Sequence, residues 1–321
     1  MKLSLLVGGC LMPSIELHCH SNKSDGSLDP GQLIEDASEL GISRLSITDH
    51  DKVTFGESLA RHALELGIIL IPGVEFSTYD QEANLGVHVL GHGFDPGHDA
   101  ISRFIDLQKQ ARSNYADALV QKIKSQGLEL NREAIPDGVS VTKYNLAEAV
   151  LAQNPEDIIT SLLGTKARSV GHFIELTMNQ GGVFFVPKSS VSPKNAVDCI
   201  HNAGGVASVA HPIEYLYRGT SAEVVQGIVQ RSGVDGLEVF YDYIPSDTSE
   251  PLGKVEQRDY EGILSIMAKS LGLEMLAGSD FHRYDEGRTL GSRSEYISIA
   301  DNSPFFPIVS VSSEFKVFPR E

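Results

Sequence analysis

Histidines and carboxylates recur in short clusters along the chain, and these are the residue types that hold catalytic metals. His18 and His20 form a His-x-His pair, and Asp280 and His282 repeat the same spacing far along the chain. Imidazole and carboxylate are common protein ligands of zinc, manganese and iron. Metals held in this way activate water and bind phosphate oxygens. The candidate ligands are His18, His20, Asp25, His50, Glu75, His88, His211, Asp280 and His282.

The spacing within the pairs indicates that β-strands carry them. Side chains two positions apart on a strand point to the same face, so His18 and His20 can chelate one ion. A single pair is weak evidence, but the second pair at Asp280 and His282 argues against coincidence. Glu75 follows a strongly apolar stretch, where an unpaired carboxylate is costly to bury, and we expect it to bridge two metals.

Some positions leave alternatives open. His92 lies four residues after His88 and would share its face on an extended strand, although His88 is the favoured ligand. Asp25 precedes a glycine and also suits a turn. Asp49 and Asp51 fit equally well as partners that orient a neighbouring imidazole or as caps of the following loop.

Short apolar runs alternate with amphipathic helical patterns, which predicts an α/β protein. Most candidate ligands fall at or just beyond the C-terminal end of a predicted strand, where α/β barrels place their active sites. We therefore expect a single metal site at that end of a barrel. Strands are predicted at 14–20, 45–48, 68–71, 86–90, 206–210, 236–240 and 274–277, and helices at 30–40, 54–66, 193–203, 222–231 and 254–271.

The alternation stops in the middle of the chain. Helical patterns at 100–126, 143–151, 157–163 and 167–179 follow one another there with no clear strand between them. We therefore divide the chain into residues 12–95 as the first part of the barrel, 96–184 as a helical insertion, and 185–321 as the second part of the barrel.

Composition limits the partners and the compartment. The net charge of −17 argues against non-specific nucleic-acid or membrane binding, because both need basic patches. Bound divalent ions would still attract an anionic substrate. Cys10, Cys19 and Cys199 lack the spacing of a disulfide framework or thiolate site, which favours a reducing cytosol. The apolar stretch at 3–7 is shorter than a signal-peptide core of about 7–15 residues, and either Met1 or Met12 is the start.

These clusters resemble the PHP (polymerase and histidinol phosphatase) family of metal-dependent phosphoesterases. Within that family the chain is most similar to stand-alone phosphatases that act on nucleotides, including 3′,5′-bisphosphates and short RNA 5′ ends. The resemblance implies a distorted (β/α)7 barrel with the helical insertion as a cap. It spans residues 15–291 and rests on His18-Cys19-His20-Ser21 through Ser24-Asp25-Gly26, Ile47-Thr48-Asp49-His50-Asp51, Gly73-Val74-Glu75, His88-Val89-Leu90-Gly91, Ala210-His211-Pro212 and Gly278-Ser279-Asp280-Phe281-His282.

The resemblance also implies a reaction and a distribution of ligands over two to three divalent ions of zinc, manganese or iron. A metal-bridging hydroxide would attack the phosphorus of a small phosphomonoester. Glu75, His211 and Asp280 would be the catalytic residues. The implied ligand sets are His18, His20, Glu75 and Asp280 for one metal, Glu75, His88 and His211 for a second, and Asp25, His50 and His282 for a third.

The basic residues that would bind substrate depart from the pattern of the related nucleotide phosphatases. Those proteins carry arginine in a segment of the type Arg-Thr-His-Phe-Ala-Arg, where this chain has residues 141–146, and Gly-Arg-Tyr where it has Ile213-Glu214-Tyr215. Lys143, Lys188 and Arg283 are the candidate replacements. A lysine binds phosphate as a point charge, without the two-pronged geometry of arginine.

We therefore expect a cytoplasmic metal-dependent phosphoesterase that hydrolyses a small phosphomonoester such as a nucleotide or a 3′,5′-bisphosphate. We expect no membrane partner and no stable nucleic-acid partner. One alternative is phosphodiesterase or exonuclease action on short oligonucleotides. Another is a non-catalytic metal-binding module, although the complete ligand set argues against it, because a decayed site would lose its ligands first.

Overall fold

The computed structural model describes residues 14–131, 143–179, 181–186, 191–244, 253–284 and 288–293. The chain divides into two compact units, Met1–Ile105 with Ser192–Glu321, and Asp106–Val191. All nine candidate ligands belong to the first unit. Met1, Met12 and Lys188 lie outside the described residues.

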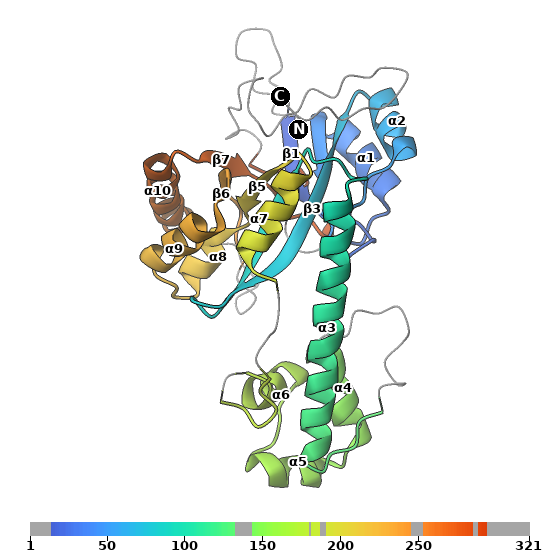
Figure 1. The fold of residues 1–321 in the computed structure, drawn as a ribbon, viewed down its shortest axis with the longest axis vertical. Coiled ribbons are helices and arrows are strands. Elements are labelled where there is room, and N and C mark those ends of the chain that lie inside the picture. Colours follow the sequence, from blue (N-terminus) through green and yellow to red (C-terminus); the bar gives the residue numbers. More distant parts are fainter. Residues whose placement is uncertain are drawn as a thin grey trace. The chain divides into compact units, whose positions relative to one another are not determined.

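A curled sheet forms the centre of the first unit (Figure 1). The described strands join in one seven-stranded sheet in chain order. Parallel pairing joins β1 to β2 to β3 and β5 to β6 to β7, whereas β3, β4 and β5 pair antiparallel. The strands are β1 (Ser14–Cys19), β2 (Ile42–Ile47), β3 (Ile69–Asp80), β4 (Leu85–His92), β5 (Val206–Val209), β6 (Gly236–Phe240) and β7 (Glu274–Ala277).

The first and last strands meet at the end of the sheet that carries the ligands. Cys19 forms a parallel bridge with Phe281. The N–H of His20 donates to the carbonyl of Phe281 at 2.8 Å, and the N–H of Asp280 donates to the carbonyl of His18 at 2.8 Å. The curl of the sheet therefore brings the two ligand pairs from opposite ends of the chain side by side.

Helices cover the outside of the sheet, and for the first of them the local signals agree with the predicted bounds. At the start of α1, Asp29 accepts a hydrogen bond from the N–H of Gly31 and a proline takes the first turn. Buried Leu33 and Ile34 of this helix pack against Leu45 of β2. The helices of this unit are α1 (Pro30–Glu39), α2 (Glu57–Glu65), α7 (Pro193–Asn202), α8 (Pro212–Tyr217), α9 (Ala222–Ser232) and α10 (Lys254–Leu271).

The connection from β3 to β4 departs from regular β/α alternation. Pro72 and Gly73 are typical of a turn, and the predicted strand accordingly ended at residue 71. The structure continues β3 to Asp80 and returns directly into β4, with Asn84 in the left-handed region at φ 52°. No helix separates these two described strands, because antiparallel neighbours can be joined by a short turn, whereas parallel neighbours need a crossover.

The second unit is helical where the sequence predicted helices. Helix α3 (Asp99–Ser125) begins in the first unit and continues into the second. It is followed by α4 (Lys143–Gln153), α5 (Glu156–Leu163) and α6 (Val170–Thr177). Leu119, Leu146 and Phe173 are among the residues of a separate buried core. No helix among the described residues is long and apolar enough to cross a membrane.

Candidate metal centre

The fold brings candidate ligands from six strands and their following loops into one cluster. His18 lies on β1, Glu75 on β3 and His88 on β4, whereas His211 follows β5. His50 follows β2 and forms a parallel bridge with Glu75. The chain after β7 supplies a carboxylate and an imidazole to the same cluster, Asp280 and His282.

One group of four ligand atoms belongs to residues that are all buried. His18 Nε2 lies 3.4 Å from Glu75 Oε2 and 3.2 Å from Asp280 Oδ1. His20 Nε2 lies 3.2 Å from Glu75 Oε2 and 3.0 Å from Asp280 Oδ1. Four ligands at about 2.0–2.2 Å from a tetrahedral zinc ion are about 3.3–3.6 Å apart, so this group has dimensions close to those that a metal requires.

The same atoms lack the hydrogen bonds that buried polar atoms ordinarily make. Among the described residues, His18 Nε2, His20 Nε2 and Glu75 Oε2 are buried and have no hydrogen-bond partner. Native proteins leave few buried polar atoms unpaired, and a bound metal ion is one way to satisfy those that remain. The donor set and its unpaired atoms therefore fit a divalent metal.

A second group lies on the more exposed side of the cluster. His20, Asp25, His50 and His282 each offer one atom to it. Asp25 Oδ1 lies 3.3 Å from His282 Nε2, and Asp25 Oδ2 lies 3.6 Å from His50 Nε2. The loop residue Asp25 thus faces two imidazoles from distant parts of the sheet.

Glu75 is at the centre of the cluster and joins its groups. Oε2 lies 2.9 Å from His50 Nδ1, while Oε1 lies 2.9 Å from His88 Nδ1 and 3.1 Å from His211 Nε2. The side chain is fully buried. A third group of potential ligands consists of His50, Glu75 and His88, with His211 beside the same carboxylate. The position of Glu75 suits a carboxylate shared between metals.

Charges within the metal-free cluster compensate one another. Burial alone would raise the pKa of Glu75, but His50, His88 and His18 hold that pKa well below its usual range. Burial lowers the pKa of His50, yet the charges of Glu75, Asp25 and Asp280 outweigh it and raise this pKa to about 9. Without metals, protons on the imidazoles therefore balance the buried carboxylates.

His88 and His92, the two alternatives for this ligand position, differ in their contacts. His88 Nδ1 faces the central carboxylate of Glu75 at 2.9 Å. His92 is fully buried, and its Nε2 lies 2.8 Å from the carbonyl oxygen of Leu17. Burial lowers the pKa of His92 to about 4, so this ring is neutral at physiological pH. His88 is thus the histidine of this pair that the structure places in a metal-type group.

The two aspartates that flank His50 hold backbone loops. Asp49 Oδ1 accepts from the N–H of Ser21 at 2.8 Å and from Ser24 Oγ at 2.6 Å, and the hydroxyl of Thr54 donates to Oδ2. Asp51 accepts from the N–H of Ser77 at 2.9 Å. Asp49 therefore fixes the loop that carries Asp25.

The contacts of the three candidate substrate-binding residues, Lys143, Lys188 and Arg283, do not test their predicted role. Lys143 Nζ donates to Asn179 Oδ1 at 3.1 Å within the second unit. Arg283 is exposed and directly follows His282. Lys188 lies outside the described residues. Binding of substrate by these residues stays a prediction.

Sequence reasoning missed several charged and polar residues behind the ligands. Arg288 Nη1 donates to Asp280 Oδ2 at 2.8 Å, and the hydroxyl of Tyr241 donates to the same oxygen at 3.0 Å. These two donors occupy Oδ2 and leave Oδ1 for the imidazoles. Buried Glu16 accepts from the N–H groups of His18 and Gly291 at 2.9 and 2.7 Å. Glu16 could have been singled out from the sequence, because a charged residue within an apolar strand is unusual. No local sequence pattern distinguishes Arg288.

Comparison with known proteins identifies the family. The PHP domain model matches residues 16–179. A curated protein of Haemophilus influenzae, a 5′-3′ exoribonuclease, is 30% identical over 270 residues, covering 83% of this chain and 89% of that protein. The chain belongs to the PHP domain family.

Other relatives of this PHP protein include hydrolases of small phosphorylated molecules. A 3′,5′-nucleoside bisphosphate phosphatase of Chromobacterium violaceum is 27% identical over 276 residues, covering 86% of this chain and 90% of that protein. A solved structure of a candidate metal-dependent phosphoesterase from Bifidobacterium adolescentis has the same fold, with a TM-score of 0.59 at 22% identity and coverage of 87% and 91% of the two chains. This PHP protein is a metal-dependent phosphoesterase.

Proposed function

We propose that the protein hydrolyses a small phosphomonoester, such as a nucleotide, at the cluster around Glu75. The observation that carries this proposal is the convergence of imidazoles from different strands on one buried carboxylate, with imidazole nitrogens within 3.1 Å of each of its oxygens. Such a set has no role in ordinary core packing, where charged side chains are seldom fully buried.

Three groups of side chains would hold the metals. We assign His18, His20, Glu75 and Asp280 to the first, Glu75, His88 and His211 to the second, and Asp25, His50 and His282 to the third. The short distances from His50 to Glu75 and from His20 to Asp25, 2.9 and 3.7 Å, make both rings candidates for two groups. Two to three divalent ions of zinc, manganese or iron, when bound there, would activate water and stabilise charge on phosphoryl oxygens.

Glu75, His211 and Asp280 are the proposed catalytic residues, because Glu75 Oε1 lies 3.1 Å from His211 Nε2 and Glu75 shares a group of potential metal ligands with Asp280. Their backbones support fixed positions. His211 and Asp280 both adopt the left-handed region, with φ values of 32° and 48°. Non-glycine residues in this region are uncommon and cluster at functional sites.

The charge beside the cluster favours a substrate with one phosphate near the metals. Glu214 stands where related nucleotide phosphatases carry arginine. Its Oε2 lies 3.4 Å from His211 Nδ1, and its Oε1 pairs with Arg218 at 2.8 Å. A second phosphate at this position would meet a carboxylate, and like charges at close range repel each other. We therefore expect a 5′-monophosphate to be a better substrate than a 3′,5′-bisphosphate.

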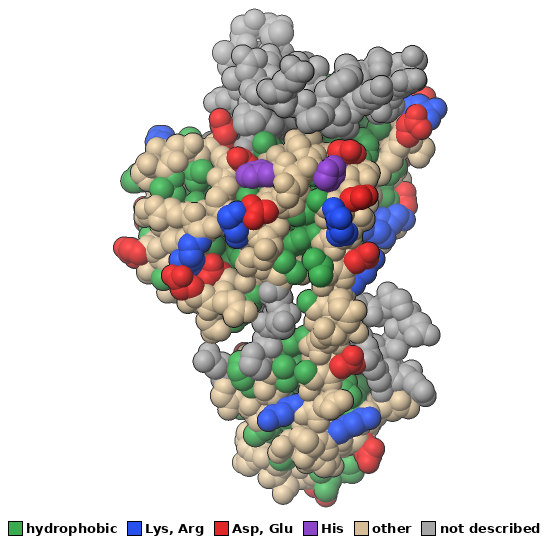
Figure 2. All heavy atoms as spheres, viewed as in Figure 1, with side chains coloured by type: hydrophobic (Ala, Val, Ile, Leu, Met, Phe, Trp, Pro, Cys, Tyr) green, Lys and Arg blue, Asp and Glu red, His purple; other side chains and the backbone are tan. Residues whose placement is uncertain are grey.

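Exonuclease or phosphodiesterase action on short oligonucleotides is the second candidate. The exoribonuclease relative favours it, since that protein is similar over most of both chains. On the face shown in Figure 2, acidic and basic side chains are interspersed and form no continuous basic stripe of the kind that binds long nucleic acids. Residence in the cytoplasm and a capping role for residues 96–184 stay predictions.

A substrate screen tests the proposal. The protein is purified with Mn²⁺ and assayed with nucleoside 5′-monophosphates, a 3′,5′-bisphosphate, bis-p-nitrophenyl phosphate and a 5′-phosphorylated RNA pentamer. His282→Ala serves as the inactive variant, and His62→Ala, on α2, as the matched histidine control. Release of phosphate from monoesters alone supports the phosphatase. Faster release of mononucleotides from the pentamer supports the exonuclease. Absence of turnover with every substrate in the fully metal-loaded protein would refute both.

A further inference from the structure

The metal cluster has a buried carboxylate behind it that joins two ligands from different strands. Glu238 lies on β6, and 1% of its surface is exposed. We infer that Glu238 is a positioning residue that orients His18 and His211 together toward the metals. This inference rests on the proposed metal site and adds to it the residue that sets the geometry of two ligands.

Each oxygen of Glu238 contacts a different ligand residue. Oε1 lies 3.0 Å from His18 Nδ1. Oε2 accepts a hydrogen bond from the backbone N–H of His211 at 2.6 Å. Nε2 of each ring faces Glu75, at 3.4 Å for His18 and 3.1 Å for His211. Glu238 and Glu75 thus contact opposite sides of the His18 ring, whereas Glu238 holds His211 by its backbone.

The contact with His18 selects the tautomer that can bind a metal. An ionised carboxylate only accepts hydrogen bonds, so the ring must carry its proton on Nδ1. In the neutral ring that binds a metal, Nε2 is then left with a lone pair that points toward Glu75 and Asp280. Metal-bound histidines usually donate their second N–H in this way, which fixes the orientation of the ring and raises its basicity.

The contact with His211 fixes a backbone that would otherwise be unfavourable. His211 is the N-cap of α8 and has φ 32° and ψ 50°. Most residues with a side chain avoid this region. The hydrogen bond from its N–H to Glu238 favours this conformation, which turns the chain from β5 into α8 and keeps the ring against Glu75.

The contact between Glu238 and His18 also explains why position 278 holds a glycine. A Cβ atom at Gly278 would lie 2.4 Å from Glu238 Oε1 and 2.4 Å from the Cβ atom of His18. Both distances are too short for any side chain. The backbone after β7 therefore passes directly against the pair of Glu238 and His18, and only glycine leaves room for it.

Glu238→Gln is the informative variant because it keeps the volume and removes the symmetry of the carboxylate. A glutamine has one acceptor oxygen and one NH₂ donor, so it can accept from only one of the two ligands. If its oxygen faces His211, its NH₂ faces His18 Nδ1 and favours a proton on Nε2, where the metal binds. If its oxygen faces His18, its NH₂ opposes the N–H of His211.

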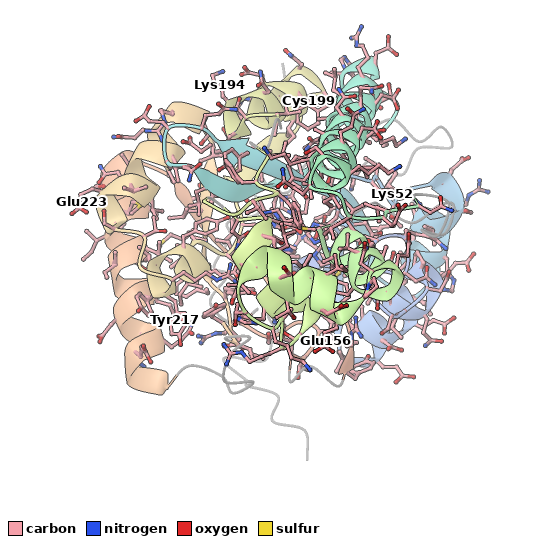
Figure 3. All side chains as sticks on the ribbon, turned by 90° about the horizontal axis from the view of Figure 1, so that it is seen from below. Lys52, Glu156, Lys194, Cys199, Tyr217 and Glu223 are labelled. Carbon is pink, nitrogen blue, oxygen red and sulfur yellow. The ribbon has the colours of Figure 1, made fainter. Side chains whose placement is uncertain are left out.

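Zn²⁺ affinity and stoichiometry provide the test, measured by competition with a chelator and by elemental analysis. We expect Glu238→Gln to keep the circular dichroism of the parent and to bind its tightest Zn²⁺ about 10–100-fold more weakly, the usual effect of losing such a partner. Glu223→Gln, at the exposed start of α9 (Figure 3), is the matched control and should bind like the parent. Unchanged Zn²⁺ affinity in folded Glu238→Gln would overturn the inference.

A measurement on the unaltered protein covers the case in which the variant does not fold. In a Zn²⁺-loaded sample with ¹⁵N-labelled histidine, the His18 ring should show a protonated Nδ1 and a metal-bound Nε2. The opposite assignment contradicts the role of Glu238. Absence of Zn²⁺ binding by the unaltered protein would instead refute the proposed metal site itself, so the two failures are distinguishable.

Discussion

Removing the metals should give the protein an unusual dependence of stability on pH, and His50 allows its size to be worked out. In the metal-free protein the pKa of His50 is raised to about 9, because the charges of Glu75, Asp25 and Asp280 outweigh the effect of burial. In the unfolded chain a histidine has a pKa of about 6.5. A raised pKa in the folded state means that protonated His50 stabilises the fold below pH 6.5, and that this contribution is lost as the pH rises through 9.

The magnitude follows from proton linkage. With these two pKa values, His50 contributes roughly 2–3 kcal/mol to the free energy of unfolding at pH 7 and almost nothing at pH 9.5. The loss of roughly 2–3 kcal/mol corresponds to a fall in Tm of roughly 5–10 °C for a domain of this size. The pKa values of His18, His211 and His282 are also raised, so their contributions have the same sign.

Urea unfolding at pH 7.0 and 9.5, in excess EDTA, measures this effect. The parent should be less stable at the higher pH, and His50→Gln should lose about 2 kcal/mol less between the two pH values. With metal in place of EDTA the trend should reverse, because metals bind neutral imidazole and their affinity rises as the protons leave. Metal-free stability that is flat or rises from pH 7.0 to 9.5 would refute the reasoning, as would equal losses in the parent and the variant.

Three further outcomes are expected. Asp25→Asn should reduce the bound metal by one ion per chain and abolish turnover, measured by elemental analysis and phosphate release. Asp49→Ala should lower the free energy of unfolding by about 2–3 kcal/mol in urea, because buried donors lose a charged acceptor. Gly73→Ala would place a Cβ 2.1 Å from Ser46 Oγ, whereas Gly86→Ala meets nothing within 4 Å. The first should therefore destabilise by about 1–3 kcal/mol more than the second in thermal melts, and equal effects would contradict the close approach.

Local patterns were sufficient for most elements of the first unit. The prediction for 254–271 coincides with α10, and the prediction for 236–240 coincides with β6. Apolar periodicity and helix caps depend only on neighbouring residues, so one sequence reveals them. Helix α8 was missed because its six residues follow directly on a strand end. The extension of β3 past Pro72 was missed because its pairing with β4 outweighs the turn signal.

The sequence by itself determined the residue types of the metal cluster and their pairing in twos. His-x-His and Asp-x-His spacings are set by the repeat of two residues along a strand, which needs no knowledge of the fold. It also determined that Glu75 would be buried, since the preceding stretch is strongly apolar.

Only the tertiary structure decided which ligand faces which. Asp25 meets His282, and His18 meets Glu238, across 220 residues or more, because the sheet curls until β1 and β7 lie side by side. The curl arises from the twist and stagger of paired strands, which no single strand encodes. The same arrangement separated His88 from His92 and placed Arg288 behind Asp280. The residue types of the ligands could therefore be predicted from the sequence, whereas the residues that orient these ligands depend on contacts between distant segments.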